Sequence, residues 1–199
     1  LRDGLVKTEE QRQQIYDVVL RETMRLSRLV NDMLELSRLQ SGTASLSRSV
    51  FAPLPLFNLI HETYSAYAED YQQTFVYDVP EDLPSVWGNP DRTQQVLIVL
   101  LDNAFKYTPE GGVVTLCACA EGDVVRVRVR DTGVGIPAAD LPHVFDRFYK
   151  VDKSHHSKGT GLGLAIAYEI MKHLGEEMSV TSEPGQGSCF TFTLHIAQG

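Results

Sequence analysis

The chain has 199 residues, 43% of them hydrophobic, which is enough for one ordinary folded domain and a smaller element beside it. Its formal net charge of -8 argues against a general nucleic-acid binder, because such proteins use Lys and Arg to displace counterions from phosphates. No apolar run approaches the roughly 20 residues needed to cross a bilayer, so we expect no membrane contact by this chain.

The first strong pattern is a long helix. No Gly or Pro occurs from Thr8 to Gln40, and Thr8 with Gln11 fits a capping box. Apart from Glu22, apolar residues recur at alternating spacings of three and four: Ile15, Val19, Leu26, Leu29, Met33 and Leu36. The pattern favours the seam of a dimerising helical hairpin, and an amphipathic helix lying on its own domain is the alternative.

A stretch rich in Ser, Gly and Thr then interrupts the helical pattern. We therefore predict a helical unit over residues 1–41, a linker over 42–50 and a second domain over 51–199. In that domain we expect helices over 54–71, 90–106 and 161–174, and strands over 74–78, 85–87, 113–120, 124–131, 178–182 and 188–196. Helices covering one face of a mixed sheet give a two-layer α/β sandwich.

Two glycine clusters carry most of the chemical information. Asp131 closes a strand and is followed by Gly133 and Gly135, and glycines there let a ligand touch the backbone. The second cluster, Gly159 to Leu164, lies directly before a helix, where free amides and the helix dipole favour a phosphate. The second cluster follows a polar stretch where a Rossmann fold would need a strand, and the chain contains no GxxxxGK(S/T) P-loop motif. Each cluster alone is more often a tight turn.

Two further segments accompany the glycine clusters. Phe145 to Tyr149 brings three aromatic residues beside a basic stretch, and such a segment can fold over a nucleotide or be a packed loop. Asn103 and Lys106 are three residues apart near the end of a helix, so they share a face. A carboxamide oxygen suits Mg²⁺ and an ammonium group suits a phosphate oxygen.

Together these four segments resemble the N box, first glycine box, F box and second glycine box of histidine kinases. Leu26 to Leu34 is similar to the second helix of that family's dimerisation hairpin, and Ser182 to Ser188 to its final glycine turn. The resemblance implies a Bergerat-type ATP-binding fold, which is a two-layer α/β sandwich, preceded here by a long dimerisation helix.

The resemblance also implies roles for individual residues. Asp131 would accept the adenine amino group, Gly133 and Gly135 would admit the adenine, and Asn103 would bind Mg²⁺. Lys106 would meet a phosphate, and Tyr107 would lie beside the nucleotide. The full set of expected ATP-binding residues is Asn103, Lys106, Tyr107, Asp131, Gly133, Gly135, Ile136, Phe148, Lys150, Gly159, Thr160, Gly161, Leu162, Gly163 and Leu164.

The activity implied is transfer of the γ-phosphoryl group of Mg-ATP to a histidine, with Asn103 and Lys106 as the catalytic residues. ATP and Mg²⁺ would be the ligands. The resemblance further implies a homodimer formed through the dimerisation helices and a response regulator receiver domain as partner. We expect a cytoplasmic fragment of a longer receptor anchored in the cell membrane.

The chain departs from the family pattern in two ways. Nothing matches the His-Glu-Leu-Arg-Thr-Pro-like acceptor segment, and all six histidines stand elsewhere, so we expect the acceptor to be absent. Val99 occupies the position where the N box usually carries another Asn. These departures leave a nucleotide-binding or dimerisation module with little catalysis as the alternative function.

A metal site is not expected elsewhere in the chain. His155 and His156 are adjacent in a polar stretch, which favours a solvated lid over a metal site. Cys117, Cys119 and Cys189 form no CxxC pair, which favours small buried residues in a reducing compartment.

Overall fold

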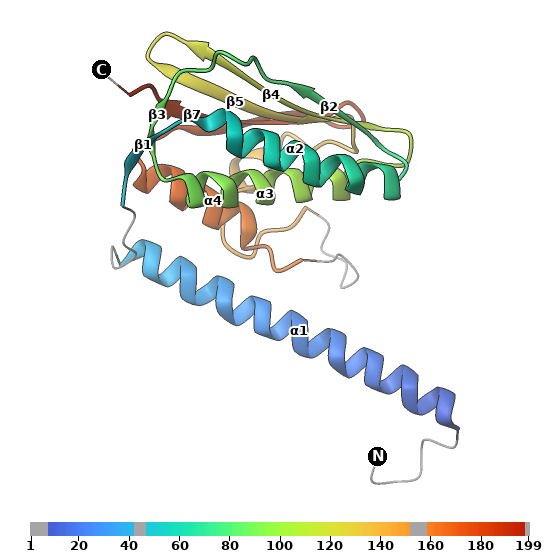
Figure 1. The fold of residues 1–199 in the computed structure, drawn as a ribbon. Coiled ribbons are helices and arrows are strands. Elements are labelled where there is room, and N and C mark those ends of the chain that lie inside the picture. Colours follow the sequence, from blue (N-terminus) through green and yellow to red (C-terminus); the bar gives the residue numbers. More distant parts are fainter. Residues whose placement is uncertain (1–7, 42–46, 152–158, 198–199) are drawn as a thin grey trace.

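The computed structural model describes residues 8–41, 47–151 and 159–197, and it confirms a long helix followed by an α/β sandwich (Figure 1). The helices are α1 (Glu9–Gln40), α2 (Pro53–Asp70), α3 (Pro90–Tyr107) and α4 (Gly163–His173), with a short 3₁₀ turn η1 (Leu141–His143). The strands are β1 (Ser49–Phe51), β2 (Thr74–Asp78), β3 (Val86–Gly88), β4 (Val113–Glu121), β5 (Val124–Asp131), β6 (Met178–Glu183) and β7 (Gly187–His195).

The main sheet is mixed, as predicted. Its five strands lie in the order β2-β4-β5-β7-β6, with β2 and β4 parallel and the other neighbours antiparallel. Helices α2, α3 and α4 cover one face, and the other face is open (Figure 1). β1 and β3 form a separate two-stranded sheet, joined to the end of β7 by a bridge between Val86 and Ile196.

Local capping sets the helix starts. The side chain of Asn89 accepts a hydrogen bond from Arg92 N at 3.0 Å, and Pro90 follows at the first helical position of α3. Thr8 Oγ1 likewise accepts from Gln11 N at 3.2 Å and begins α1. None of the described helices is long and apolar enough to span a membrane.

Some boundaries differ from the prediction. Ser49 and Val50 were assigned to the linker but lie in β1. Helix α4 begins at Gly163 and not at Gly161, because Gly161 has a φ of 75°, in the left-handed region that a right-handed helix cannot contain. The prediction of domain limits at residues 41, 50 and 51 stays a prediction.

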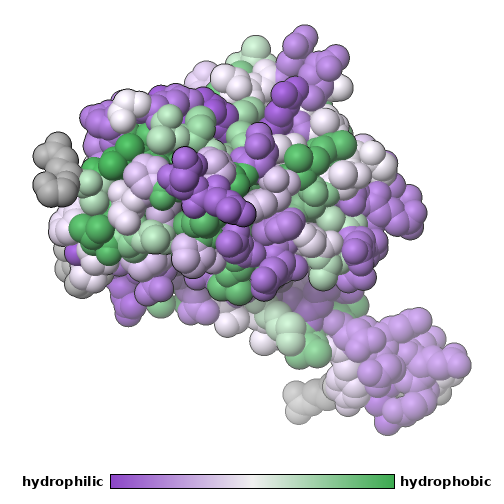
Figure 2. Space-filling model, turned by 45° about the horizontal axis from the view of Figure 1, so that its top comes forward, coloured by the Kyte–Doolittle hydropathy of each residue, from purple (hydrophilic) through white to green (hydrophobic). Residues whose placement is uncertain are grey.

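Strand β5 shows why the sheet has one buried face. Val125, Val127 and Val129 are fully buried against the helices, while Arg126 and Arg128 alternate with them on the open face. Figure 2 shows hydrophilic and apolar residues mixed over the surface that is turned toward the viewer.

The prediction that the three cysteines are buried was wrong. All three are free and only half-buried, because the alternation of β4 places Cys117 and Cys119 opposite in phase to the buried Leu116 and Ala118, and Cys189 likewise lies opposite to buried Phe190 on β7.

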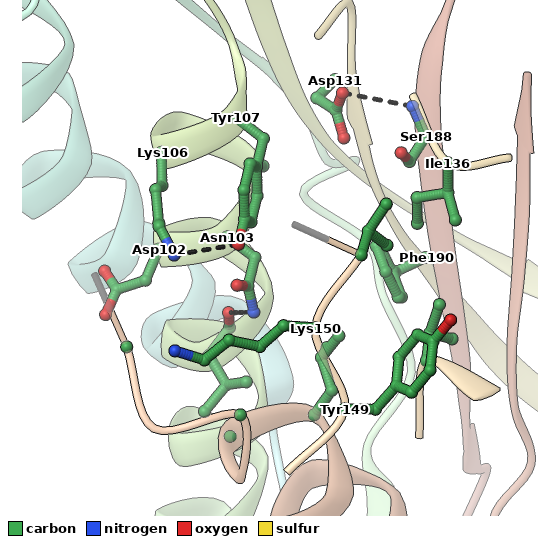
Figure 3. Close-up of a pocket in the computed structure, with 18 of the residues that line it drawn as sticks. Asp102, Asn103, Lys106, Tyr107, Asp131, Ile136, Tyr149, Lys150, Ser188 and Phe190 are labelled. Carbon is green, nitrogen blue, oxygen red and sulfur yellow. Dashed lines mark hydrogen bonds between the residues drawn. The ribbon is translucent and has the colours of Figure 1, made fainter. Parts of the chain in front are cut away.

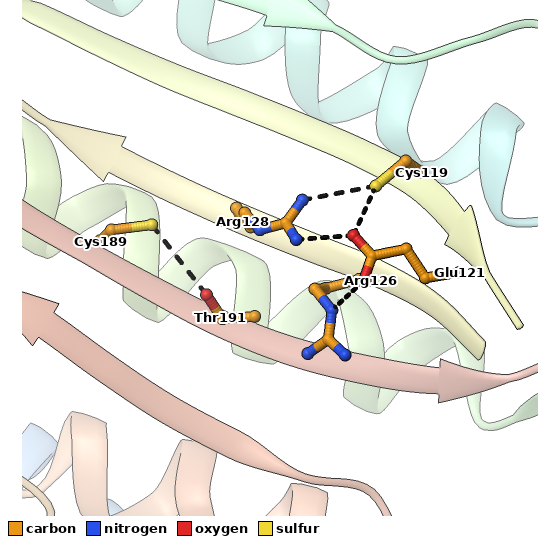
Figure 4. Close-up of polar contacts among 6 residues, drawn as sticks. All are labelled: Cys119, Glu121, Arg126, Arg128, Cys189 and Thr191. Atoms are coloured by element: carbon orange, nitrogen blue, oxygen red, sulfur yellow. Dashed lines mark hydrogen bonds and ion pairs between the residues drawn. The ribbon is translucent and has the colours of Figure 1, made fainter.

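A polar cluster on the open face holds Cys119 (Figure 4). Its thiol lies 3.2 Å from Glu121 Oε1, and Arg128 Nη1 lies 3.3 Å from its sulfur. Hydrogen bonds from Arg126 and Arg128, each at 2.6 Å, lower the pKa of Glu121 to about 2. The carboxylate therefore stays ionised across the physiological pH range.

Helix α1 divides into two parts. Of the six residues in the predicted seam, Ile15, Val19, Leu26 and Met33 are 40–61% exposed. Leu29, by contrast, packs partly against the core, and Leu36 is 4% exposed and packs in the core together with Leu39. The last turns of α1 thus dock on the α/β unit, and only the N-terminal part projects from it (Figure 1).

Candidate functional site

A cleft of about 440 Å³ lies between the helical layer and the ends of the central strands (Figure 3). Its walls come from α3, the loop after β5, the segment after η1, the loop before α4 and the start of β7. The four segments that the sequence singled out are therefore brought together around one cavity.

Asp131 is the most constrained polar residue in this cleft. It is 5% exposed, and its Oδ1 accepts hydrogen bonds from Gly133 N at 2.8 Å and Ser188 N at 3.1 Å. Burial raises the pKa of Asp131, and the two amide hydrogen bonds offset part of that rise. Its Oδ2 accepts no hydrogen bond from the described residues, so it is available to a donor on a ligand.

Glycines allow the backbone to close around this carboxylate. A Cβ on Gly133 would lie 2.3 Å from Tyr107 O, and one on Gly187 would lie 2.0 Å from Asp131 O. Either contact is far below any real Cβ distance, so a larger residue would push β5 away from α3 or from β7. The position of Asp131 thus depends on one glycine in the loop after β5 and on another at the start of β7.

The first glycine loop is also tied to the turn between β6 and β7. A Cβ on Gly135 would lie 2.1 Å from Glu183 O, and Gly185 N donates to Val134 O at 2.8 Å. Ile136 N donates to the Ser182 hydroxyl, also at 2.8 Å. This turn is the segment whose sequence resembles the final glycine turn of histidine kinases. It holds the first glycine loop in place at the outer wall of the cleft.

Helix α3 supplies a polar edge to the cleft. Asn103 Nδ2 donates to Val99 O at 2.8 Å, which leaves the amide oxygen of Asn103 as the acceptor that a ligand or cation can use. Lys106 Nζ donates to the Tyr107 hydroxyl at 2.9 Å and lies 4.5 Å from the centre of the Tyr107 ring. Lys106 and Lys150 extend toward the same part of the cleft (Figure 3).

The second glycine loop offers backbone amides. Leu162, the N-cap of α4, has no side chain that can cap the helix, so the first turn presents unsatisfied N–H groups. Phe148 N donates to Gly161 O at 2.9 Å, which holds this loop against the segment after η1. An uncapped helix start beside two lysines is suited to an anion such as a phosphate.

Twelve of the fifteen expected ATP-binding residues line the cleft. They are Asn103, Lys106, Tyr107, Asp131, Gly135, Ile136, Lys150, Gly159, Thr160, Gly161, Gly163 and Leu164. Three do not. Gly133 contacts Asp131 through its backbone N–H, and Leu162 is fully buried in the core. Phe148 has a φ of 61° and is 54% exposed to solvent. Their roles toward ATP stay predictions, as do those of the other twelve.

Sequence reasoning missed several residues of the wall. Tyr149 lines the cleft where Phe148 was expected, and its hydroxyl donates to Asp140. Ser188 and Phe190 enter from the start of β7 because that strand pairs with β5. No local spacing signals such a pairing. Asp102 also lines the cleft and accepts a hydrogen bond from the Tyr64 hydroxyl at 2.7 Å.

Mg²⁺ prefers oxygen ligands, and Asn103 offers one amide oxygen to the cleft. No cluster of three or more His, Cys, Asp or Glu side chains is found in the described part of the chain. The amide oxygen of Asn103 faces a cleft whose lysines and backbone N–H groups suit phosphates, so it fits an ion whose remaining ligands would be phosphate oxygens and water. His155 and His156 lie outside the described residues.

Two family models match the chain. The family described as histidine kinase-, DNA gyrase B- and HSP90-like ATPase matches residues 88–198, and the His Kinase A (phospho-acceptor) domain matches residues 1–42. The sensor histidine kinase WalK of Bacillus subtilis is 39% identical over 181 residues, which cover 89% of this chain and 30% of WalK. The chain spans less than half the length of the first curated relatives that it matches.

Solved structures agree with these matches. Full-length ShkA in complex with AMPPNP superposes with a TM-score of 0.81 at 32% identity, covering 98% of this chain and 42% of ShkA. Histidine kinase ThkA in complex with the response regulator protein TrrA gives a TM-score of 0.76 at 20% identity, covering 96% of this chain and 53% of that one. The second likeness shows the fold alone.

The glycine contacts generate a matched pair of substitutions. Gly135 and Gly122 have φ values of 70° and 66°, but only Gly135 faces backbone within 4 Å, since a Cβ on Gly122 would meet nothing. Both Gly→Ala variants carry the left-handed cost of about 1–2 kcal/mol. We expect Gly135→Ala to lower the melting temperature further and to open the cleft, because Glu183 must also move. Thermal unfolding of the two variants measures the difference, and equal melting temperatures would contradict the close contact.

Proposed function

This chain belongs to the sensor histidine kinases, and from that membership we propose that it is their ATP-binding catalytic module, which transfers the γ-phosphoryl group of ATP to a histidine. The observation that carries the proposal is the buried Asp131, with one oxygen held by two backbone amides and the other turned to no described partner. Such an acceptor can select the amino group of adenine.

The rest of the cleft suits the phosphates of the same ligand. Lys106, Lys150 and the uncapped start of α4 supply positive charge and N–H donors at one end of the cavity, and Asp131 lies at another part of it. In phosphoryl transfer a protein acts mainly by positioning groups and neutralising charge, so no nucleophilic side chain is needed here. Asn103 would hold Mg²⁺, which would neutralise charge on the transferred group.

The acceptor histidine is proposed to lie outside this chain. The phospho-acceptor family model matches residues 1–42, yet that range contains no histidine, and the first histidine is His61. We infer that the parent protein dimerises through α1 and its hairpin partner, and that phosphate passes to a response regulator. The ThkA complex with TrrA supports such a partner for a relative. We also propose that this part is cytoplasmic in a membrane-anchored parent.

A module with little catalysis is the second candidate, and one observation favours it. Val99 lines the cleft beside Asn103 and packs partly against the core, so the side chain at this position offers no oxygen to a metal. If an oxygen ligand at this position is essential for phosphoryl transfer, the chain would bind the nucleotide without transferring its phosphate.

A phosphotransfer assay tests the proposed activity. Incubated with radiolabelled Mg-ATP, this chain should label a separately supplied acceptor hairpin with acid-labile, base-stable phosphate. The chain alone should stay unlabelled, because its own range 1–42 carries no histidine. Stoichiometric labelling of any of its six histidines would show that the nucleophile is misplaced. Binding of ATP without transfer to the supplied hairpin would favour the second candidate.

Replacing Asp131 by Asn tests the adenine contact. We expect Asp131→Asn to weaken Mg-ATP binding roughly tenfold or more, because an amide in place of Oδ2 can present a donor to the adenine amino group. Isothermal titration of parent and variant measures this, and equal affinities would remove Asp131 from the site.

Thermal stability distinguishes weaker ATP binding by Asp131→Asn from misfolding of the variant. Because burial raises the folded-state pKa of Asp131, its contribution to stability is present at low pH and is lost as pH rises through that raised pKa. Asp131→Asn should therefore not unfold at a lower temperature than the parent at pH 7. A folded variant with weak binding is the expected combination.

Replacing Val99 by Asn tests the lost oxygen ligand. Val99 lies one turn before Asn103 on the same face, and its Cγ1 lies 3.4 Å from where a Cβ of Gly163 would be. We expect Val99→Asn to lower the Mg²⁺ concentration needed for ATP binding by a small factor, about twofold to fivefold, since water can also fill the position. Titrating Mg²⁺ at fixed ATP gives the result, and an unchanged Mg²⁺ dependence in a folded variant would mean that Val99 replaces no ligand.

A further inference from the structure

A hydrogen bond joins helix α1 directly to the candidate site. The Thr160 hydroxyl donates to Asp32 Oδ2 at 2.8 Å, and Thr160 lines the cleft in the second glycine loop. Asp32 is partly buried and forms no ion pair with the residues that the structure describes. A carboxylate from the helix therefore lies against the loop in which we place the nucleotide phosphates.

The chemistry of a hydroxyl makes this contact exclusive. Thr160 has a single O–H proton, and the same oxygen accepts a hydrogen bond from Leu162 N at 3.3 Å. The proton can go to Asp32 or to a phosphate oxygen, but not to both. A phosphate at this loop would also place negative charge near the Asp32 carboxylate, and two like charges repel.

Several other contacts of α1 with the α/β unit lie away from the loop. Glu35 pairs with Arg92 and accepts from Gln95 Nε2 at 3.0 Å, both at the start of α3. Gln40 Nε2 donates to Glu169 Oε1 on α4 at 3.2 Å, and Leu36 and Leu39 are buried in the core. These contacts lie C-terminal to Asp32 along α1, whereas Leu29, which precedes Asp32 by about one turn, packs partly against the core. Asp32 can therefore lose its partner while the end of the helix stays docked.

We propose that Asp32 competes with a nucleotide phosphate for Thr160, so that binding of a triphosphate and docking of this part of α1 oppose each other. The proposal rests on the proposed function, because it requires that the cleft binds ATP. By linkage the effect is reciprocal: release of α1 from the loop favours the phosphate as much as the phosphate favours release.

Nucleotide affinity measured on the whole chain tests the proposal. We expect Asp32→Ala to bind Mg-AMPPNP at least about fivefold more tightly than the parent, which is the lower end of typical coupling between sites. Asp32→Asn should gain less, because it removes the negative charge but its amide oxygen can still accept a hydrogen bond from Thr160. Adenosine, which lacks phosphates, should bind parent and variants within about twofold of one another. Glu35→Gln is the matched control, since it removes a carboxylate from the same helix face that contacts α3 and not the loop.

The outcomes are distinct. Unchanged or weaker Mg-AMPPNP binding by both Asp32 variants, with circular dichroism showing them folded, overturns the proposal while leaving the proposed function intact. An equal gain in Glu35→Gln also overturns it, because the effect would then come from helix docking in general and not from Thr160. A parent that binds neither ligand overturns the proposed function and the proposal together.

Hydrogen exchange checks the reciprocal effect in the parent. Mg-AMPPNP should speed amide exchange in the part of α1 around Asp32 and leave the turn at Leu36 to Leu39 unchanged, because that turn stays buried. Equal exchange around Asp32 with and without saturating Mg-AMPPNP would show that the helix does not respond to phosphate.

Discussion

The cleft depends on the approach of three backbone segments around one buried carboxylate. Asp131 ends β5, and the amides of Gly133 and Ser188 reach its Oδ1 from the loop that follows and from the start of β7. Each approach is possible only because Gly133 and Gly187 lack a side chain. A buried carboxylate without those amides would carry the full cost of desolvation, so the same hydrogen bonds that position Asp131 also make its burial tolerable.

The helical layer completes what the sheet begins. Helix α3 ends near the first glycine loop and brings Asn103 and Lys106 to the polar edge of the cleft. Helix α4 begins at the second glycine loop, and no side chain caps the backbone N–H groups of its first turn. The two helices thus present opposite ends to the same cavity. The cation from Lys106 near the end of α3 and the positive end of the α4 dipole are both favourable toward an anion between them.

The sequence predicted those helices and strands that are marked by patterns among neighbouring residues. Asn89 with Pro90 marks the start of α3, and the alternation of Val and Arg marks β5 and its buried face. The three-residue strand β1 was missed because its partner, β3, lies far along the chain and a short strand shows no periodic pattern of its own. Ser188, Phe190 and the Asp32 contact were also missed, because each arises from packing between distant segments.

The phase of β5 has a consequence for how this chain can change over evolution. Asp131 lies on the same face of β5 as Val125, Val127 and Val129. The direction of the Asp131 side chain and the burial of the three valines therefore depend on the same strand register. Inserting one residue within the strand would turn Asp131 to the open face and bring Arg130 inward. Length variation is instead tolerated at the tip of the β4–β5 hairpin, where Gly122 has open space around it. Relatives that retain the carboxylate at the position of Asp131 should therefore vary in length at this hairpin tip. They should keep the same number of residues between the positions of Val125 and Asp131.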